Sequence, residues 1–543
     1  MHLCLVGAEC EENLSLRYLA AAARQAGHRP EIVPFNTEDE LPTVAKRLLE
    51  IDPPFVGLSM AFQHRSREFV ELVRALRRGG YRGHICCGGH VPTPAWEEIL
   101  TWVPEIDTVV RHDGEQTLVE LLGALDSPER WPAIHGVCCR DAAGRPVAAP
   151  PRRQVDDLDE LPFPLRVTPH LEHAGVKFAP LVGSRGCYGD CNYCCINSWH
   201  RTSNGKRFRL RSPENLAAEM AYLYHDRDVR IFCFHDDTFF MPRPRDTLKR
   251  LGALRAALDR QRVGRVGMVG KCRPDGLDLE LLRTAREHGV FRLYVGVENG
   301  SEAGLLHLGR RHDRQSCFRA MELLREAGVF ACFNILLFEP ECRLEELDET
   351  VELLERFSDF PFNFCRTEIY SGSRYERTLR EAGRLRGSFL GYSYEIAEPR
   401  AELAYRLMSV CFRGRNFSVN GVANVNTGMG YEAAVVRHFY GALGEPLARE
   451  ADALIEEINR DTVKRLRELL RFAAECDVDD SAAACDFAEE LATAINFRDL
   501  ELGTRQRDLR QRIKSFGLEH ASLALDPPSP TVGTEHEHHL GGA

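Results

Sequence analysis

The chain has 543 residues, of which 44% are hydrophobic and 28% charged, and its formal net charge is −11. This length predicts about three globular domains, and the acidic balance excludes the basic footprint of a nucleic-acid-binding protein. The 19 cysteines show no disulfide-scaffold spacing, and we expect neither a signal peptide nor a membrane span. The expected setting is therefore a reducing cytoplasm, where free thiols are available to bind metal.

Residues 1–145 are expected to form a doubly wound α/β domain. Short apolar runs predict strands, and an amphipathic stretch that predicts a helix follows each of them. The strands are expected at 2–7, 30–34, 55–60, 84–87 and 107–110, and the helices at 14–26, 39–50, 66–78, 94–102 and 115–125. Five such units predict a flavodoxin-like fold, which binds ligands beyond the carboxyl ends of its parallel strands. A hairpin is expected at 134–149.

A Pro-rich, acidic linker is expected at 146–177, and the strand–helix alternation resumes over 178–387. The strands are expected at 178–184, 229–235, 265–271, 291–297, 329–337 and 363–370, and the helices at 213–226, 245–260, 278–288, 314–327, 344–357 and 373–383. Six such units predict an open, partial (β/α)6 barrel. Its catalytic residues should lie at the carboxyl ends of its strands.

Strands are expected to stop at about residue 388. Residues 388–525 predict a helical C-terminal domain, for example at 448–472 and 482–500. The last stretch, 526–543, is rich in Pro, Gly and His and is predicted to be a disordered tail.

Three cysteines follow the first strand of the predicted barrel, with the spacing Cys187-x3-Cys191-x2-Cys194. Glycines in this loop allow it to curl tightly, so that the three thiolates can converge on one iron–sulfur cluster and leave one iron without a protein ligand. The alternatives are free cysteines or a zinc site. Zinc would need a fourth ligand nearby, and His200 is a candidate.

With this motif the chain resembles the radical S-adenosylmethionine superfamily over about 178–385. The resemblance implies a 4Fe–4S cluster on the three cysteines, and S-adenosylmethionine bound to the open iron. The residues that it assigns to S-adenosylmethionine are Tyr193, Asp236, Asp237, Glu298, Asn299 and the backbone at Ile335. Tyr370 lies on the loop that should face the substrate. Asn334 and Phe338 stand where the family usually has glycines.

The N-terminal domain resembles the cobalamin-binding domain of one large subclass of that superfamily. Three stretches carry the resemblance: Val56–Ser59, Cys87–Thr93 and Asp107–Glu115. The residues that it assigns to cobalamin are Ser59, Gly88, Gly89, Thr93, Gly114 and Glu115. No Asp-x-His-x-x-Gly signature follows the first strand, so no histidine from that loop is expected on the lower face of the cobalt.

The resemblance favours a cobalamin-dependent radical methyltransferase that acts on an unactivated carbon of a small-molecule natural product. A flavodoxin- or ferredoxin-type protein is the expected electron donor. Two enzymatic alternatives remain: a radical rearrangement or cyclisation without methyl transfer, and a radical enzyme whose cobalamin domain is vestigial. An RNA methylthiotransferase would need a second cluster on N-terminal cysteines that are badly placed for it, and a non-catalytic cobalamin sensor would not need the cysteine motif.

Overall fold

The computed structural model describes residues 1–167 and 169–525, and the predicted tail at 526–543 lies outside them. Its first domain is a seven-stranded sheet with the strand order β2-β1-β3-β4-β5-β6-β7. The strands are β1 (His2–Gly7), β2 (Arg29–Pro34), β3 (Phe55–Ser59), β4 (His84–Gly88), β5 (Thr108–Val110), β6 (Val137–Arg140) and β7 (Pro146–Ala148). The first five are parallel in the order 2-1-3-4-5, which confirms the flavodoxin-like expectation.

Helices cover both faces of this sheet. One apolar layer joins the sheet to α1 (Leu14–Gln25) and α5 (Glu115–Leu122). The other joins it to α2 (Leu41–Ile51), α3 (Ser66–Arg78) and α4 (Pro92–Trp102). The predicted hairpin is the antiparallel pair β6–β7, and β7 extends the sheet beyond residue 145, where the linker was expected to begin.

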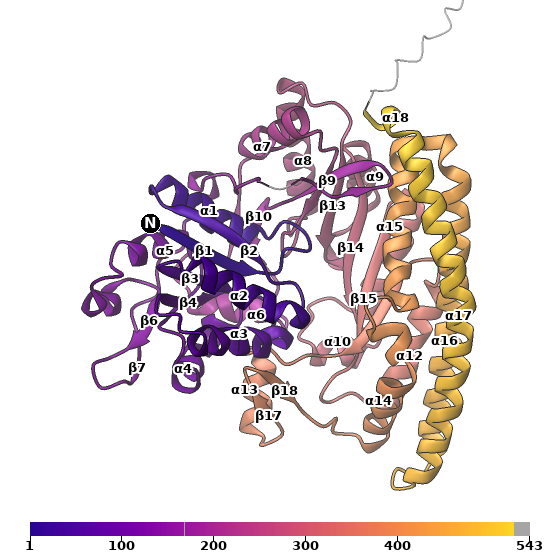
Figure 1. The fold of residues 1–543 in the computed structure, drawn as a ribbon. Coiled ribbons are helices and arrows are strands. Elements are labelled where there is room, and N and C mark those ends of the chain that lie inside the picture. Colours follow the sequence, from indigo (N-terminus) through magenta and orange to yellow (C-terminus); the bar gives the residue numbers. More distant parts are fainter. Residues whose placement is uncertain (168, 526–543) are drawn as a thin grey trace, which may run out of the picture.

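The second domain is an open half-barrel beside the first (Figure 1). Its strands, in spatial order, are β16 (Phe362–Arg366), β15 (Phe330–Phe338), β14 (Val290–Glu298), β13 (Gly267–Cys272), β12 (Ile231–Phe234), β9 (Val176–Leu181) and β8 (Glu172–His173). All are parallel except β8, a short antiparallel strand within the expected linker. The outer helices are α7 (Pro213–Arg227), α8 (Pro244–Arg260), α9 (Leu279–Glu287), α11 (Arg314–Ala327), α12 (Leu344–Arg356) and α13 (Arg374–Glu381).

The sequence patterns missed several short elements around the barrel mouth. The first barrel strand was expected to continue to residue 184 but ends at Leu181, and Ser184–Gly186 forms a separate strand, β10, paired with β11 (Phe208–Leu210). Two short helices, α6 (Cys195–Thr202) and α10 (Glu302–His307), were also missed. Each is too short for a helical period to stand out in the sequence.

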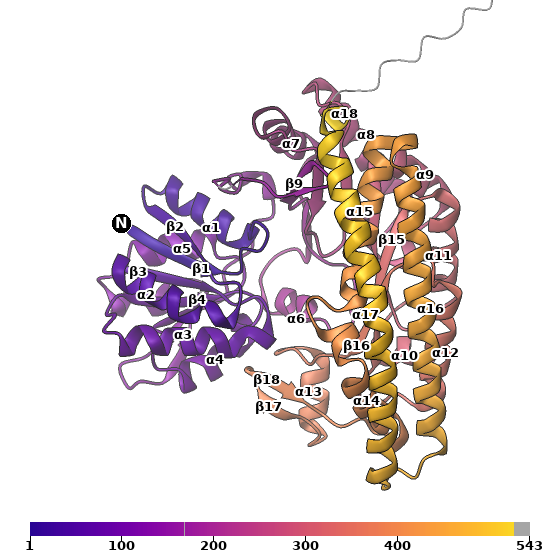
Figure 2. The ribbon, with the colours of Figure 1, turned by 45° about the vertical axis from the view of Figure 1, so that its right-hand side comes forward.

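Within the described residues, five α-helices follow the barrel: α14 (Pro399–Cys411), α15 (Val422–Tyr440), α16 (Glu445–Glu475), α17 (Ser481–Glu519) and α18 (Ala521–Leu525). The expectation that strands stop at 388 was wrong, because β17 (Arg386–Ser388) and β18 (Gly391–Ser393) form a hairpin across that point. Helix α15 packs on the sheet face opposite to the outer helices, against Phe178, Ile231 and Phe291. Figure 2 shows α16 and α17 along the side of the molecule away from the first domain. No helix in the described part of the chain is both long and apolar enough to cross a membrane.

Candidate functional site

The cysteine loop starts from the ribbon of β10 and β11 at the mouth of the barrel. Gly186 ends β10 with φ +88°, and a Cβ atom there would overlap the carbonyl oxygen of Arg207, which directly precedes β11. The chain can therefore turn into Cys187 only through glycine. Cys191 follows within the loop, and Cys194 stands directly before the first residue of α6.

The three thiols lie among arginines. The Nη1 atom of Arg310 is 3.3 Å from the Sγ atom of Cys191, and the backbone N–H of Gly189 donates to Cys187 Sγ at 3.3 Å. Burial nevertheless raises the pKa of Cys187, and raises that of Cys194 well above its usual value. Thiolates in such a place need a bound metal to stabilise them.

The arrangement fits a cluster better than it fits zinc. A tetrahedral zinc site would need a fourth ligand beside the three thiolates. His200, the candidate fourth ligand, turns toward Gln154, with 3.5 Å between its Nδ1 atom and the amide nitrogen. Three thiolates without a fourth ligand match a 4Fe–4S cluster, in which one iron is left open.

Asp236 and Asp237 follow β12 but differ in environment. The Oδ1 atom of Asp236 accepts from the N–H of Gly183 at 2.7 Å, and Oδ2 accepts from the hydroxyl of Ser184 at 2.8 Å. This carboxyl is buried, and burial raises its pKa to about 6. Asp237 is exposed and accepts only a 3.2 Å bond from the N–H of Gly186. Asp236 therefore supports the loop, while Asp237 keeps oxygens available for a ligand.

Glu298 meets Tyr193 and Arg310 beside the cluster loop. Glu298 ends β14 with φ +68°, and Arg310 Nη1 lies 3.8 Å from its carboxylate and 3.4 Å from the Tyr193 hydroxyl. Burial raises the pKa of Glu298, and Arg310 opposes that rise. Ile335 pairs with Glu298 across the sheet. These predicted S-adenosylmethionine residues are thus brought together next to Cys191.

Asn299 differs from its predicted neighbours because its side chain already has partners. Its Oδ1 atom accepts from the N–H of Ser301 at 2.9 Å and from the hydroxyl of Thr350 at 3.0 Å. Its amide donates to the carbonyl of Leu336 at 3.2 Å. Asn299 therefore shapes the turn after β14 through its side chain.

The residues predicted to hold cobalamin lie at the carboxyl edge of the first sheet. Ser59 and Gly88 end β3 and β4, and they pair with each other. Gly89 has φ +116°, and a Cβ atom there would lie 2.9 Å from the carbonyl oxygen of Met60. This bare backbone edge fits the close approach of a large flat ligand. Gly114 caps α5 and Glu115 is its first residue.

Two of these residues also contact the elements on either side of the cysteine loop. Thr93 Oγ1 accepts from the indole N–H of Trp199 on α6 at 3.1 Å. Glu115 accepts from Arg185, two residues before the first cysteine, at 2.6 Å. Sequence reasoning missed Trp199 and Arg185, because a long-range ion pair or hydrogen bond leaves no periodic signal along the chain.

The Tyr370 loop closes a third side of the same space. Gln63, after β3, donates to the carbonyl of Ile369 at 2.5 Å and accepts from the N–H of Ser371 at 2.8 Å. Gly372 has φ +75°, and a Cβ atom there would meet Pro94 at 2.6 Å. Burial and Glu368 raise the pKa of the Tyr370 hydroxyl. Three loops, from two domains, therefore surround one region at the ends of two sheets.

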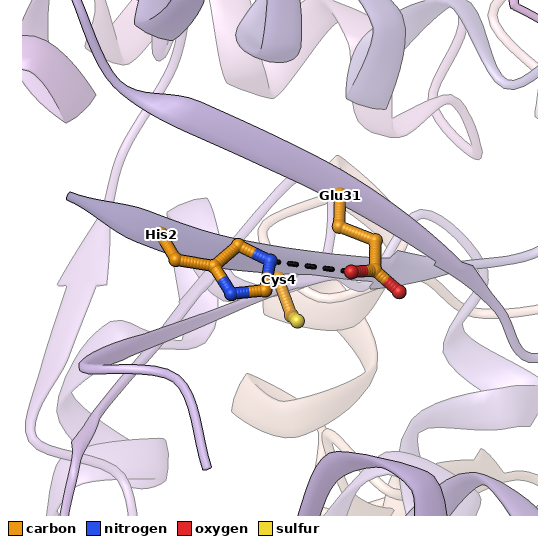
Figure 3. Close-up of side chains that lie close together, drawn as sticks. All are labelled: His2, Cys4 and Glu31. Carbon is orange, nitrogen blue, oxygen red and sulfur yellow. Dashed lines mark hydrogen bonds and ion pairs between the residues drawn. The ribbon is translucent and has the colours of Figure 1, made fainter. Parts of the chain in front are cut away.

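A second group of possible metal ligands lies outside this region, on β1 and β2 (Figure 3). His2, Cys4 and Glu31 have ligand atoms within 4.8 Å of one another. Glu31 already pairs with His2 at 3.2 Å and with Arg47 at 2.8 Å. Burial raises the pKa of Cys4 to about 12. Because the carboxylate already bonds to His2 and Arg47, and burial keeps the Cys4 thiol protonated, we interpret this group as a cross-strand contact between side chains.

Comparison with known proteins identifies both ligand-binding domains. The B12 binding domain family matches residues 3–122, and the Radical SAM superfamily matches residues 181–354. An uncharacterized methyltransferase of Pyrococcus horikoshii is 25% identical over 66% of this chain and 77% of its own length. An anaerobic magnesium-protoporphyrin IX monomethyl ester cyclase of Synechocystis is 27% identical, over 46% of this chain and 48% of its own length.

Solved structures share the fold. The cobalamin-dependent S-adenosylmethionine radical enzyme OxsB has a TM-score of 0.66 at 16% identity, covering 95% of this chain and 84% of that chain. The radical S-adenosylmethionine methyltransferase TsrM of Kitasatospora setae has a TM-score of 0.56 at 17% identity, covering 71% and 77%.

The two domains and the cysteine loop between them define an iron–sulfur radical enzyme with a corrinoid-binding domain. The chain belongs to the radical S-adenosylmethionine superfamily, in the subclass that carries a B12 binding domain. Its cofactors are a 4Fe–4S cluster, S-adenosylmethionine and cobalamin.

Proposed function

We propose that this enzyme methylates an unactivated carbon of a small-molecule natural product. The observation that carries the proposal is that residues predicted to bind cobalamin contact the two elements that flank the cysteine loop, Thr93 through Trp199 on α6 and Glu115 through Arg185 on β10. A cobalamin at that edge would face the same region as the cluster. The methyltransferase of Pyrococcus, which aligns with 66% of the chain, also supports it.

Different residues of the chain bind the cluster and S-adenosylmethionine. Cys187, Cys191 and Cys194 hold the cluster, and Asp237 and Glu298 bind the polar groups of S-adenosylmethionine. When bound, the three cofactors supply a radical that removes hydrogen from carbon and a methyl group that replaces it.

The backbone around Gly88 and Gly89 admits the corrin, with Ser59 as a hydrogen-bonding side chain. The Tyr370 loop contacts the substrate. Helix α15 covers the concave face of the half-barrel and excludes water from the base of the cavity.

A radical cyclisation without methyl transfer is the second candidate. The cyclase of Synechocystis supports it, and so does a cyclase of Rubrivivax gelatinosus that is 24% identical over 59% of this chain. Both candidates use the same cofactors, so the difference lies in what happens to the substrate radical.

Product analysis with labelled S-adenosylmethionine tests the proposal. The anaerobically reconstituted enzyme would be incubated with a metabolite extract, a reductant and S-adenosylmethionine that carries a deuterated methyl group. Methyl transfer through cobalamin predicts S-adenosylhomocysteine together with 5′-deoxyadenosine, and small molecules that carry the label. Formation of 5′-deoxyadenosine without S-adenosylhomocysteine or label would favour cyclisation instead.

A further inference from the structure

An unusual concentration of arginine surrounds one acid of the cysteine loop. Asp190 lies directly before Cys191, and the side chains of four arginines reach within 4 Å of its carboxylate. They are Arg201 at 3.6 Å, Arg207 at 3.8 Å, Arg311 at 3.7 Å and Arg374 at 3.2 Å. We call these four residues the basic rim. One carboxylate offsets one of the four charges, so the rim keeps a net charge of about +3.

The basic rim is on the surface. The exposed fractions of its side chains are 38% for Arg201, 42% for Arg207, 71% for Arg311 and 35% for Arg374. The whole chain is acidic, with a net charge of −11. A positive patch on an acidic protein, placed over one loop, attracts a negatively charged partner to that loop.

Two rim residues also hold the loop in shape. Arg207 donates to the carbonyl of Gly189 at 3.0 Å, and Arg374 donates to the side chain of Asn192 at 2.8 Å. Arg201 and Arg311 reach Asp190 only at 3.6 and 3.7 Å. The loop does not need these two arginines for its hydrogen bonds, so their charge is available to a partner.

An exposed apolar side chain stands next to the rim. Leu306 on α10 is 73% exposed, and α10 is tied to the loop by the bond from Asn192 N–H to the Leu308 carbonyl at 2.9 Å. Leu306 and Arg311 line one hollow of about 320 Å³, and the acids Asp275, Glu302 and Asp313 line it too. An apolar contact beside a charged rim is typical of a transient protein interface.

We propose that the basic rim is the docking surface for an acidic, one-electron carrier protein of the flavodoxin type. This inference rests on the proposed radical chemistry, in which the oxidised cluster must gain one electron before each S-adenosylmethionine is cleaved. In the docked complex the reduced carrier loses that electron and the cluster gains it. The carrier needs to approach only the loop that holds the cluster, and the rim marks that loop.

The test compares two reductants on the reconstituted enzyme and on the variant with both Arg201→Glu and Arg311→Glu. Reduced flavodoxin is an acidic protein, whereas reduced methyl viologen is a small cation that a basic surface does not attract. Rapid-freeze electron paramagnetic resonance would follow reduction of the cluster. We expect the variant to slow reduction by flavodoxin by about tenfold or more at low ionic strength and to leave reduction by methyl viologen unslowed.

Two further measurements sharpen the result. The difference between the variant and the wild type should shrink as salt is added, because salt screens the attraction. The affinity of oxidised flavodoxin for the reconstituted enzyme should also fall in the variant, and this binding measurement reports docking without turnover. The variant with both Arg449→Glu and Arg460→Glu is the matched control, because it makes the same change in net charge on α16, where these side chains are 77% and 70% exposed and pair with Glu445 and Glu456.

Three results would overturn the proposal. Equal rates with flavodoxin in variant and wild type would show that the rim does not dock the carrier. Equal slowing with both reductants would mean that the arginines act on the cluster itself. An equal loss in the control variant with Arg449→Glu and Arg460→Glu would mean that net charge alone explains the effect. A failure of methyl transfer would instead appear in the product analysis and leave these rates unchanged.

Discussion

At the residue scale, neighbouring side chains of the same type have different roles. Cys194 and Cys195 are adjacent, yet only Cys194 completes the predicted ligand set. Asp236 and Asp237 are also adjacent, yet Asp236 bonds to Gly183 and Ser184 while Asp237 is exposed. Residue type and spacing identified each pair, but the contacts of each side chain separate its members.

The assignment of the cluster ligands predicts that substitutions at nearby cysteines differ in their effect on cluster binding. Cys191→Ala should abolish binding of the 4Fe–4S cluster, because two thiolates do not hold a cubane, whereas Cys195→Ala should leave it intact. Iron and sulfide content after anaerobic reconstitution measures both. A loss of iron in Cys195→Ala equal to that in Cys191→Ala would contradict the assignment.

The raised pKa of Asp236 predicts that the stability of the protein depends on pH. Its pKa is raised to about 6 by burial, so the folded protein keeps a proton that the unfolded chain releases near pH 4. The free energy of unfolding contributed by this group is therefore highest below pH 4 and falls as the pH rises to 6, by about 3 kcal/mol in all. Asp236→Asn should remove this fall. Urea unfolding of both proteins at pH 4.5 and 6.5 measures the difference, and parallel curves would disprove the prediction.

At the scale of elements, the short pieces around the barrel mouth position the site more than the long ones do. The ribbon β10–β11 sets the start of the cysteine loop, and α6 carries Trp199 to the first domain. Periodicity located the six long βα units, because each repeats an apolar face several times. It could not locate a three-residue strand, which has too few residues for a period.

A substitution at Gly186 tests whether the β10–β11 ribbon positions the cysteine loop. Gly186→Ala combines a left-handed backbone with overlap on the Arg207 carbonyl, so we expect the ribbon to separate and the iron content after reconstitution to fall several-fold. Gly144→Ala is the control, since Gly144 has φ +79° and nothing within 4 Å of an added Cβ. It should lower the free energy of unfolding by about 1–2 kcal/mol and leave the iron content unchanged. Full iron content in Gly186→Ala would argue against the ribbon as the base of the loop.

At the scale of the whole molecule, buried ion pairs join the two cofactor-binding domains. Arg185 pairs with Glu115 at 2.6 Å and with Asp113 at 3.2 Å, and Arg209 pairs with Asp113 at 2.7 Å. The cobalamin edge and the cluster loop are therefore held in one arrangement, which a methyl transfer between them would require.

Breaking this network should loosen the contact between the domains. Arg185→Met leaves the buried carboxylate of Glu115 unpaired, which costs about 3 kcal/mol, and the variant with both Arg185→Met and Glu115→Gln should recover part of that loss. Urea unfolding and the corrinoid retained after gel filtration measure both effects. Arg153→Met, in an exposed pair with Asp156, should leave the stability nearly unchanged, because exposed ion pairs contribute little. If Arg185→Met were as stable as the wild type, the ion-pair network would not be what joins the domains.

The sequence by itself determined the order of the domains, the long strands and helices, the cysteine motif and the glycine-lined strand ends. These features are local: each is a periodic pattern or a short motif that a few adjacent residues define. Only the tertiary structure decided that Asp236, and not Asp237, supports the cysteine loop. It also gave the Asn299 side chain its hydrogen-bond partners and brought Thr93 and Glu115 into contact with the barrel domain. It also gathered Arg201, Arg207, Arg311 and Arg374 around Asp190 from positions up to 173 residues apart. Such groupings depend on how the domains pack, and packing is set by contacts between residues far apart in the chain.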